Sequence, residues 1–326
     1  MIFLKILGPV LISALCLFLA SRNVHWGELK TILASARMLP IAICILIQFL
    51  TFWLRAKRWK ILLDPFQKIQ TQVLCRWQIG ALLINYLLPL RIGEFARAYW
   101  AGHKSSLSKS TLLATIVVER IMDISSIGCV GVSILFITGF YRYSRFLTLK
   151  NLMAVVAIAV LAYALCQYLW KKYSLSIYEK IKQMLPEKIA VLVEKFMDGL
   201  KIFQDKGEVL KVFGLSIVIW SVDIALIAVF SRTLGLNLSW MQAGLLLTGL
   251  LLGVMIPAAP GAAGTYEAGG MAAMVMMGVD KTLGFSFIIF MHGFQFLLML
   301  VLGIPILILE GFHPKMILAE FKKKGS

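Results

Sequence analysis

Apolar residues in this chain of 326 residues form long unbroken runs rather than alternating with polar ones. Six runs approach the roughly 20 residues that a helix needs to cross a bilayer: 2–20, 38–54, 112–140, 152–170, 209–230 and 283–309. Two more, 77–100 and 243–278, are interrupted by proline, glycine and charged residues. The pattern predicts an all-α polytopic membrane protein with about six full spans and two broken helical hairpins.

The first interruption follows an apolar run that is too short to cross a bilayer. It contains Pro89, Arg91, Gly93, Glu94 and Arg97. Broken backbone survives at membrane depth only where protein buries it or where it lines a cavity, because hydrocarbon cannot satisfy its amides. We therefore expect a re-entrant hairpin whose charged tip faces a polar interior.

The second interruption is rich in proline, glycine and alanine. It contains Pro257, Pro260, Gly261, Gly264 and Glu267. Its small residues permit a tight turn and a close approach of the backbone, and Glu267 could cap the following helix or line a cavity. The segment has no phosphate-loop lysine and follows no soluble strand, so a nucleotide site is excluded.

The order of these segments repeats, which predicts one transmembrane domain made of two halves, about 1–140 and 150–315. Each half runs span, amphipathic segment, span, interrupted hairpin, span. Because each half contains three full spans, an odd number, the second half is expected to have the opposite orientation in the membrane. An inverted repeat with broken segments at matching positions is typical of a transporter whose site lies near the midplane.

The basic residues set the expected orientation. The net charge is +17, but the charges lie in loops between apolar runs, which indicates the positive-inside rule and excludes nucleic acid as a partner. The N-terminal side carries 23 lysines and arginines and the opposite side eight. We therefore predict a cell-membrane protein with both termini cytoplasmic.

The segment 171–208 is predicted to be a cytoplasmic amphipathic segment. Its apolar residues recur at helical spacing between lysines. This fits a helix attracted to anionic headgroups at the membrane surface. A connector that lies on the protein fits equally well.

The N-terminal run 2–20 has two interpretations. A lysine followed by an apolar core and small residues is also the pattern of a signal peptide. We favour a retained first span, because the apolar run is long for a signal peptide and its removal would break the repeat.

Charged residues within the spans are costly, so they usually face a cavity or one another. The run 112–140 contains Glu119, Arg120 and Asp123; Arg120 and Asp123 are three apart and can pair on a helix. One interpretation is an internal salt bridge that holds the first hairpin against this span. The other is a headgroup site in which arginines bind a phosphate and carboxylates bind amines or hydroxyls.

Two further residues are candidates for coupling. Asp223 has no basic neighbour close to it in its own helix, so it must find a partner elsewhere, face water or stay protonated. His292 could act as a proton-linked switch, or it could only hydrogen-bond a neighbouring helix.

Signatures of common enzymes are absent from the sequence. There is no GxSxG elbow, HExxH pair or recognisable triad, and the five cysteines show no metal-type spacing. We expect no cofactor, no metal and no enzymatic activity. No ATP site is visible either, so any transport would be downhill or ion-coupled.

Three motifs together resemble the lysylphosphatidylglycerol synthase transmembrane-region family, also described as flippase-like integral membrane proteins. They are Pro-x-Arg-x-Gly-Glu-x-x-Arg from Pro89, Glu-Arg-x-x-Asp from Glu119, and Pro-x-x-Pro-Gly-Gly-x-Gly-x-x-Glu from Pro257. The sequence departs from the third motif at Ala262, which replaces its second glycine.

This resemblance implies a flippase-like fold that moves a modified phospholipid or an isoprenoid-linked headgroup between leaflets. Some members are fused to an aminoacyltransferase domain, for which this chain leaves no room after its last span. The expected function is therefore lipid translocation, with Arg91 and Arg97 holding a phosphate. A lipid-binding partner of a glycosyltransferase or lipid-modifying enzyme, and a membrane-embedded transferase, stay as alternatives.

Overall fold

The computed structural model describes residues 2–22, 24–88, 92–137, 187–256 and 258–311, and these residues form helices and no strand. This confirms the all-α prediction. The predicted span 152–170 lies outside the described residues, as do Pro89, Arg91, Pro257 and the first part of 171–208.

The long helices follow the apolar runs. They are α1 (Ile2–Ser21), α3 (Met38–Leu63), α6 (Lys109–Ile137), α9 (Lys206–Ser231) and α12 (Lys281–Leu309). Within the described residues, three segments are long and apolar enough to cross a bilayer: Met38–Leu63, Lys206–Leu234 and Lys281–Leu309. The pair Val10–Ser21 and Trp26–Ala34 bends by 84° and makes four if it counts as one broken span. These helices fit a helical membrane protein.

Helix α3 corrects the predicted span 38–54, because it continues to Leu63. Arg55 and Arg58 therefore belong to this helix and not to a loop between apolar runs. Arg58 is instead fully buried, and Arg55 is only partly exposed. Both guanidinium groups are paired with carboxylates on neighbouring helices, Arg55 with Asp223 and Arg58 with the buried Asp123, so the helix can continue past its apolar run.

The first interruption separates α4 (Thr71–Leu87) from α5 (Gly93–Lys104). The N–H of Gly93 donates a hydrogen bond of 2.7 Å to Asn85 Oδ1. A Cβ atom at Gly93 would lie 2.0 Å from the carbonyl oxygen of Ala81, so only glycine allows α5 to begin so close to α4.

The second interruption separates α10 (Trp240–Met255) from α11 (Thr265–Met276) and contains the short 3₁₀ helix η5 (Pro260–Ala262). Gly261 and Gly264 turn the chain with φ values of +67° and +89°. The two helices approach closely, because a Cβ atom at Gly253 would lie 2.1 Å from the carbonyl oxygen of Thr265. Close packing through small residues is typical of helices in membranes.

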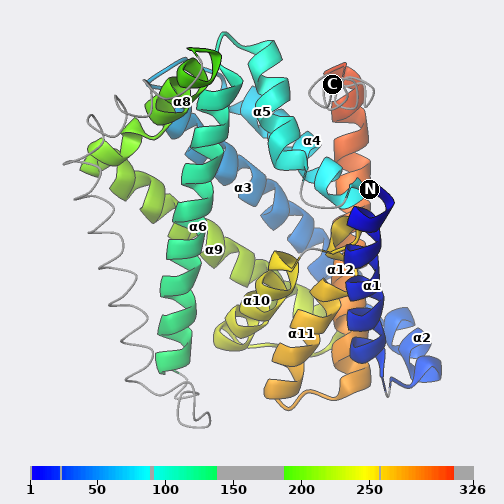
Figure 1. The fold of residues 1–326 in the computed structure, drawn as a ribbon. Coiled ribbons are helices and arrows are strands. Elements are labelled where there is room, and N and C mark those ends of the chain that lie inside the picture. Colours follow the sequence, from blue (N-terminus) through cyan, green and yellow to red (C-terminus); the bar gives the residue numbers. More distant parts are fainter. Residues whose placement is uncertain (1, 23, 89–91, 138–186, 257, 312–326) are drawn as a thin grey trace.

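Figure 1 shows the two hairpins entering the bundle from opposite ends, with their breaks near the middle. The breaks come into contact: a Cβ atom at Gly261 would lie 3.3 Å from the ring of Tyr86 in α4. Helix α1 supports the second break from the side, because Ser13 Oγ accepts a hydrogen bond of 2.8 Å from the N–H of Ala259.

The described part of 171–208 consists of α8 (Glu187–Gly199) and the 3₁₀ helix η3 (Lys201–Gln204). Helix α8 packs on α6: the Thr111 hydroxyl donates to the carbonyl oxygen of Lys195 at 3.0 Å. A Cβ atom at Gly199 would lie 2.5 Å from Cβ of Ala114. This face of α8 is therefore covered by protein.

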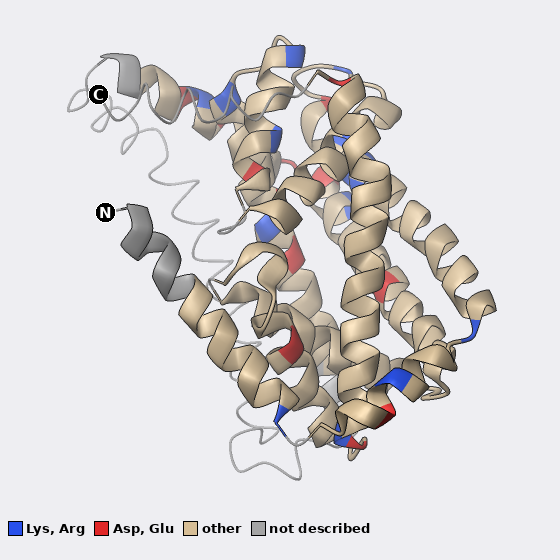
Figure 2. Cartoon of the chain, turned by 90° about the vertical axis from the view of Figure 1, so that its right-hand side faces the viewer, with Lys and Arg blue, Asp and Glu red and all other residues tan. Residues whose placement is uncertain are grey.

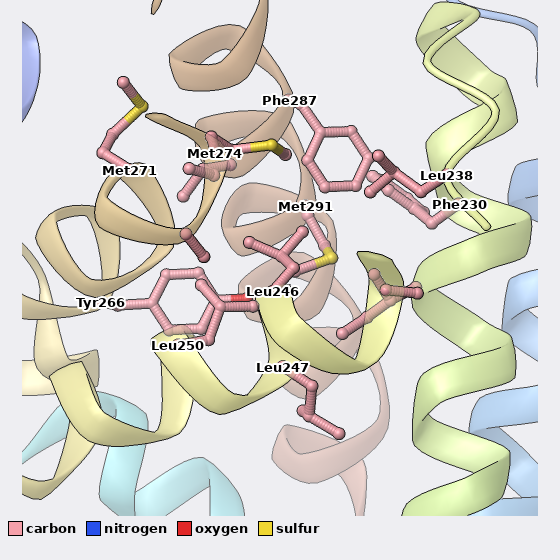
Figure 3. Packing of buried hydrophobic residues seen from close by; sticks show 14 of the residues in the cluster. Phe230, Leu238, Leu246, Leu247, Leu250, Tyr266, Met271, Met274, Phe287 and Met291 are labelled. Atoms are coloured by element: carbon pink, nitrogen blue, oxygen red, sulfur yellow. The ribbon is translucent and has the colours of Figure 1, made fainter. Parts of the chain in front are cut away.

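The described residues form two large hydrophobic clusters and a small one around Phe52, Ile79, Leu83 and Met299. One large cluster joins α3, α4, α5 and α6 around Trp59 and Trp77, and the other joins α9, α10, α11 and α12. Figure 3 shows the second cluster, in which Leu246 and Leu250 of α10 lie among Tyr266, Met291 and Phe230 from the three neighbouring helices. Each broken hairpin is thus anchored in its own cluster.

Candidate functional site

A cavity of about 460 Å³ lies where the two breaks meet. Leu88 at the end of the first hairpin helix lines it, as do Ala258, Ala259 and Gly261 from the second break. The broken backbone therefore borders a cavity, as the sequence predicted for a broken segment at membrane depth.

The lining of the cavity has two chemically different parts. Its arginines, carboxylates and histidine come from five helices and are Arg55, Glu94, Arg97, Arg120, Asp223 and His292. The apolar part comes from several helices, and α10 contributes Leu247, Leu250, Leu251, Val254 and Met255. Figure 2 shows acidic and basic residues inside the bundle as well as at its two ends.

Arg97 pairs with Glu119, which joins α5 to α6 in the protein interior. Both side chains are almost completely buried, and the Arg97 guanidinium lies 4.3 Å from the ring centroid of Trp59. The predicted salt bridge between the first hairpin and this span is therefore present. Arg97 also lines the cavity, but Glu119 occupies part of its hydrogen-bonding capacity.

Arg58 extends this contact to α3. Its guanidinium lies 2.5 Å from Asp123 Oδ1, 2.8 Å from Ser216 Oγ and 3.7 Å from Glu119 Oε1. Arg58 therefore balances two carboxylates that would otherwise be buried without sufficient counter-charge. It joins α3, α6 and α9.

Arg120 forms the predicted pair with Asp123, at 3.2 Å, and lies 3.7 Å from Glu94 on the first hairpin. Its side chain is 35% exposed and that of Glu94 is 27% exposed, and both line the cavity. This part of the network is open to a ligand, whereas Arg58 and Glu119 are not. The internal salt bridge is thus present, and Glu94 and Arg120 still face the cavity.

Asp223 finds its partner on α3, as expected of a residue with no basic neighbour in its own helix. Arg55 Nη2 lies 2.7 Å from its Oδ2, and the Thr51 hydroxyl donates to its Oδ1 at 3.2 Å. The Arg55 guanidinium also lies over the ring of Trp220, at 5.1 Å from the ring centroid. Asp223 and Arg55 both line the cavity.

Glu267 joins the second break to α12. One carboxylate oxygen accepts a hydrogen bond of 2.6 Å from the N–H of Gly264, and the other lies 2.5 Å from His292 Nδ1. The His292 ring packs against Tyr266, at 4.3 Å between ring centroids. Glu267 therefore caps α11, and His292 presents this pair to the cavity.

The predicted site residues thus fall into three groups. Those that line the cavity are Glu94, Arg97, Arg120, Asp223, Gly261 and His292. Those that hold the lining in place from behind are Gly93, Glu119, Asp123, Pro260, Gly264 and Glu267. Pro89, Arg91 and Pro257 lie outside the described residues.

Sequence analysis missed Arg55 and Arg58 because they lie in a basic stretch next to a span, which resembles a cytoplasmic loop. The available signal was helical spacing: Thr51, Arg55 and Trp59 recur every four residues, and Arg58 is next to Trp59. It also missed Gln78, Tyr86 and Gln295, polar residues that line the cavity. Both tyrosine hydroxyls, of Tyr86 and Tyr266, donate to Gln295 Oε1, at 3.3 and 3.4 Å.

Within the described residues, no group of three or more His, Cys, Asp or Glu side chains is arranged to hold a metal ion. The abundant guanidinium groups favour an anion, because each presents several donors in a fixed planar arrangement. Each of the three lining arginines also pairs with a carboxylate, so their donors are shared between the protein and the cavity.

Comparison with known proteins agrees with a helical membrane protein. The family model of the lysylphosphatidylglycerol synthase TM region matches residues 6–303. A UPF0104 membrane protein of Methanothermobacter thermautotrophicus is 24% identical over 290 residues, covering 81% of this chain and 82% of that protein. No solved structure matches the chain. The protein belongs to the lysylphosphatidylglycerol synthase transmembrane-region family.

Proposed function

We propose that this protein is a lipid translocase that moves a phospholipid-derived or isoprenoid-linked glycolipid headgroup between membrane leaflets. The observation that carries the proposal is the cavity at the two breaks, whose lining combines charged side chains with many apolar ones. A ligand suited to both kinds of lining has a polar group joined to an apolar body, as a lipid has. The family, a membrane region, agrees with this setting.

The size of the cavity favours entry of the headgroup alone. Its volume of about 460 Å³ falls in the range of about 300–1,000 Å³ that is usual for small-molecule sites. Acyl chains gain little by leaving the bilayer, because lipid tails are as apolar as the leucine side chains of α10. The headgroup would therefore cross through the protein while the chains stay in lipid.

The arrangement of the hairpins supports a transport role. We propose that both are re-entrant and belong to inverted halves of the chain, since they enter from opposite ends and their breaks meet. Broken helices around a central site are typical of secondary transporters. The excess of basic residues on the N-terminal side persists when Arg55 and Arg58 are left out, so we propose cytoplasmic termini in the cell membrane.

We assign the phosphate of the headgroup chiefly to Arg55 and Arg120. Both line the cavity with part of their surface exposed, and guanidinium groups bind phosphate oxygens through two parallel hydrogen bonds. Arg97 supports them from a more buried position. Glu94 and Asp223 hold the two arginines until the phosphate replaces them.

Reconstitution into vesicles tests this proposal. Lipids with fluorescent acyl chains and different headgroups are placed in one leaflet, and their appearance in the other is followed by quenching. We expect Arg55→Gln, Arg91→Ala and Glu94→Gln to slow transport at least tenfold. Lys211→Ala is the matched control, because Lys211 is an exposed residue paired within its own helix.

Two results would contradict the proposal in different ways. If the three variants transport as fast as the parent protein, the assignment of the site is wrong. If the parent protein moves none of the lipids but co-purifies with a lipid-modifying enzyme or glycosyltransferase, the protein is a non-transporting lipid-binding partner. Chemical alteration of the lipid by the purified protein would instead indicate an enzyme.

A further inference from the structure

Four side chains that line the cavity have a buried polar atom without a hydrogen-bond partner: Arg97 and Arg120, each at Nε, and Gln78 and Trp220. The two arginines already pair with carboxylates, whereas Gln78 and Trp220 are uncharged. Gln78 in α4 is 5% exposed and Trp220 in α9 is 6% exposed, and both line the cavity. Gln78 Oε1 and Trp220 Nε1 have no hydrogen-bond partner. Buried polar atoms are nearly always paired in folded proteins, so an unpaired atom at a cavity indicates where a ligand or water binds.

These two atoms have opposite requirements. The indole N–H of Trp220 is a donor only, so its partner must be an acceptor such as a phosphate oxygen. Arg55 lies over the Trp220 ring and adds a positive charge at the same place. The carbonyl oxygen of Gln78 is an acceptor, so its partner must carry an N–H or O–H group.

The two positions belong to one binding site. Helix α3 packs against both α4 and α9, and its Arg55 and Thr51 line the cavity together with Gln78 and Trp220. A ligand that fills this region meets a donor and a cation at the α9 side and an acceptor at the α4 side. It must itself carry an anion and a hydrogen-bond donor.

We infer that Gln78 selects headgroups that carry a hydroxyl or ammonium group beyond the phosphate. When a headgroup enters, it displaces water from the cavity. A headgroup with no donor leaves the Gln78 carbonyl unpaired, as it is in the structure, whereas a donor-bearing headgroup supplies the missing hydrogen bond. This inference rests on the proposed function for its lipid substrate, but it concerns binding rather than movement.

The experiment measures competitive binding of lipids with identical acyl chains to the purified protein by native mass spectrometry. Phosphatidylethanolamine and phosphatidylcholine have the same charge, and only the first has N–H donors. Phosphatidylglycerol and phosphatidylpropanol likewise share their charge, and only the first has hydroxyl groups. In at least one of the two pairs, we expect the donor-bearing lipid to bind about tenfold more tightly than the lipid without donors. Dimethylated phosphatidylethanolamine controls for size, because it retains one N–H.

Variants assign the preference to residues. Gln78→Leu should reduce it to less than about twofold, since leucine fills similar space without an acceptor. Trp220→Phe should weaken binding of all four lipids by a similar factor and leave the preference intact, because it removes only a phosphate donor. Gln78→Glu keeps the acceptor and should retain the preference of the ethanolamine–choline pair, which provides a second test if Gln78→Leu does not fold.

Equal binding within both lipid pairs by the parent protein overturns the inference, and so does a preference that persists in Gln78→Leu. The outcome is separable from that of the proposed function. A binding preference without movement in vesicles would leave the inference standing and remove the translocase. Movement of lipids in vesicles without any binding preference would support the translocase and overturn the inference about Gln78.

Discussion

The two broken hairpins occupy corresponding positions in the chain but are held in place by different chemistry. The first, α4–α5, is held by ion pairs: a buried pair of Arg97 with Glu119, and a partly exposed pair of Arg120 with Glu94. The second, α10–α11, is held by close packing at glycines and by the cap that Glu267 forms on Gly264. A break inside a bundle can therefore be stabilised by charge or by shape.

The difference follows from what each hairpin packs against. The first faces α3 and α6, which carry Arg58, Glu119 and Asp123 in their buried surfaces. The second faces apolar residues of α9 and α12, such as Phe230 and Met291 (Figure 3). Ion pairs tolerate small shifts of a helix less well than apolar contacts do, because an unpaired buried charge is costly. We therefore expect the two hairpins to respond differently to mutation.

The largest effect is expected from Arg58→Met. This change leaves Asp123 and Glu119 buried with less counter-charge, and loss of one partner of a buried pair typically costs about 3–5 kcal/mol. Thermal unfolding in detergent measures it. Arg55→Met is the comparison, because the Arg55–Asp223 pair is partly exposed and Thr51 still donates to Asp223. Equal losses in the two variants would contradict a special role for the Arg58 network.

A smaller loss is expected from Gly253→Ala in the second hairpin. The new methyl group would overlap the carbonyl oxygen of Thr265, and overpacking of this kind costs about 1–3 kcal/mol. Gly214→Ala in α9 is the control, because no atom lies within 4 Å of its Cβ position, and alanine favours a helix by up to about 1 kcal/mol. If both variants unfold at the same temperature, the α10–α11 contact is looser than described.

A loss of about 1 kcal/mol is expected from Glu267→Gln. The amide oxygen of glutamine can still accept the hydrogen bond from Gly264, but the contact between a carboxylate oxygen and His292 Nδ1 is lost. Glu267→Ala removes both and should be more destabilising. The two variants are compared by hydrogen exchange of the α11 amides. Equal exchange rates would mean that the cap on Gly264 contributes little.

The smallest effect is expected from Lys60→Ala. Its ion pair with Asp64 lies within one stretch of α3 and both side chains are about one third exposed, so the loss should be at most about 1 kcal/mol. Thermal unfolding at low and high salt checks this prediction. A loss as large as that of Arg58→Met would show that an exposed pair contributes as much to stability as the buried Arg58 network.

Much of the fold could be predicted because the signals are local. Apolar runs specify helices in lipid, and proline and glycine mark where they break, so the sequence predicts the two breaks that separate α4 from α5 and α10 from α11. The pair Arg120–Asp123 was also predictable, since three residues on a helix fix its distance. The end of α3 was not, because a basic stretch after an apolar run normally marks a loop.

What the sequence by itself determined is therefore the helical class, the two breaks and a set of charged residues that must be satisfied inside. Only the tertiary structure decided their partners. Arg58 pairs with Asp123 across 65 residues of chain, and Arg55 with Asp223 across 168. The physical reason is that a buried charge requires an opposite charge but does not specify which one. The packing of α3 against α6 and α9 makes that choice, and it leaves Arg55, Arg120 and Gln78 facing the cavity.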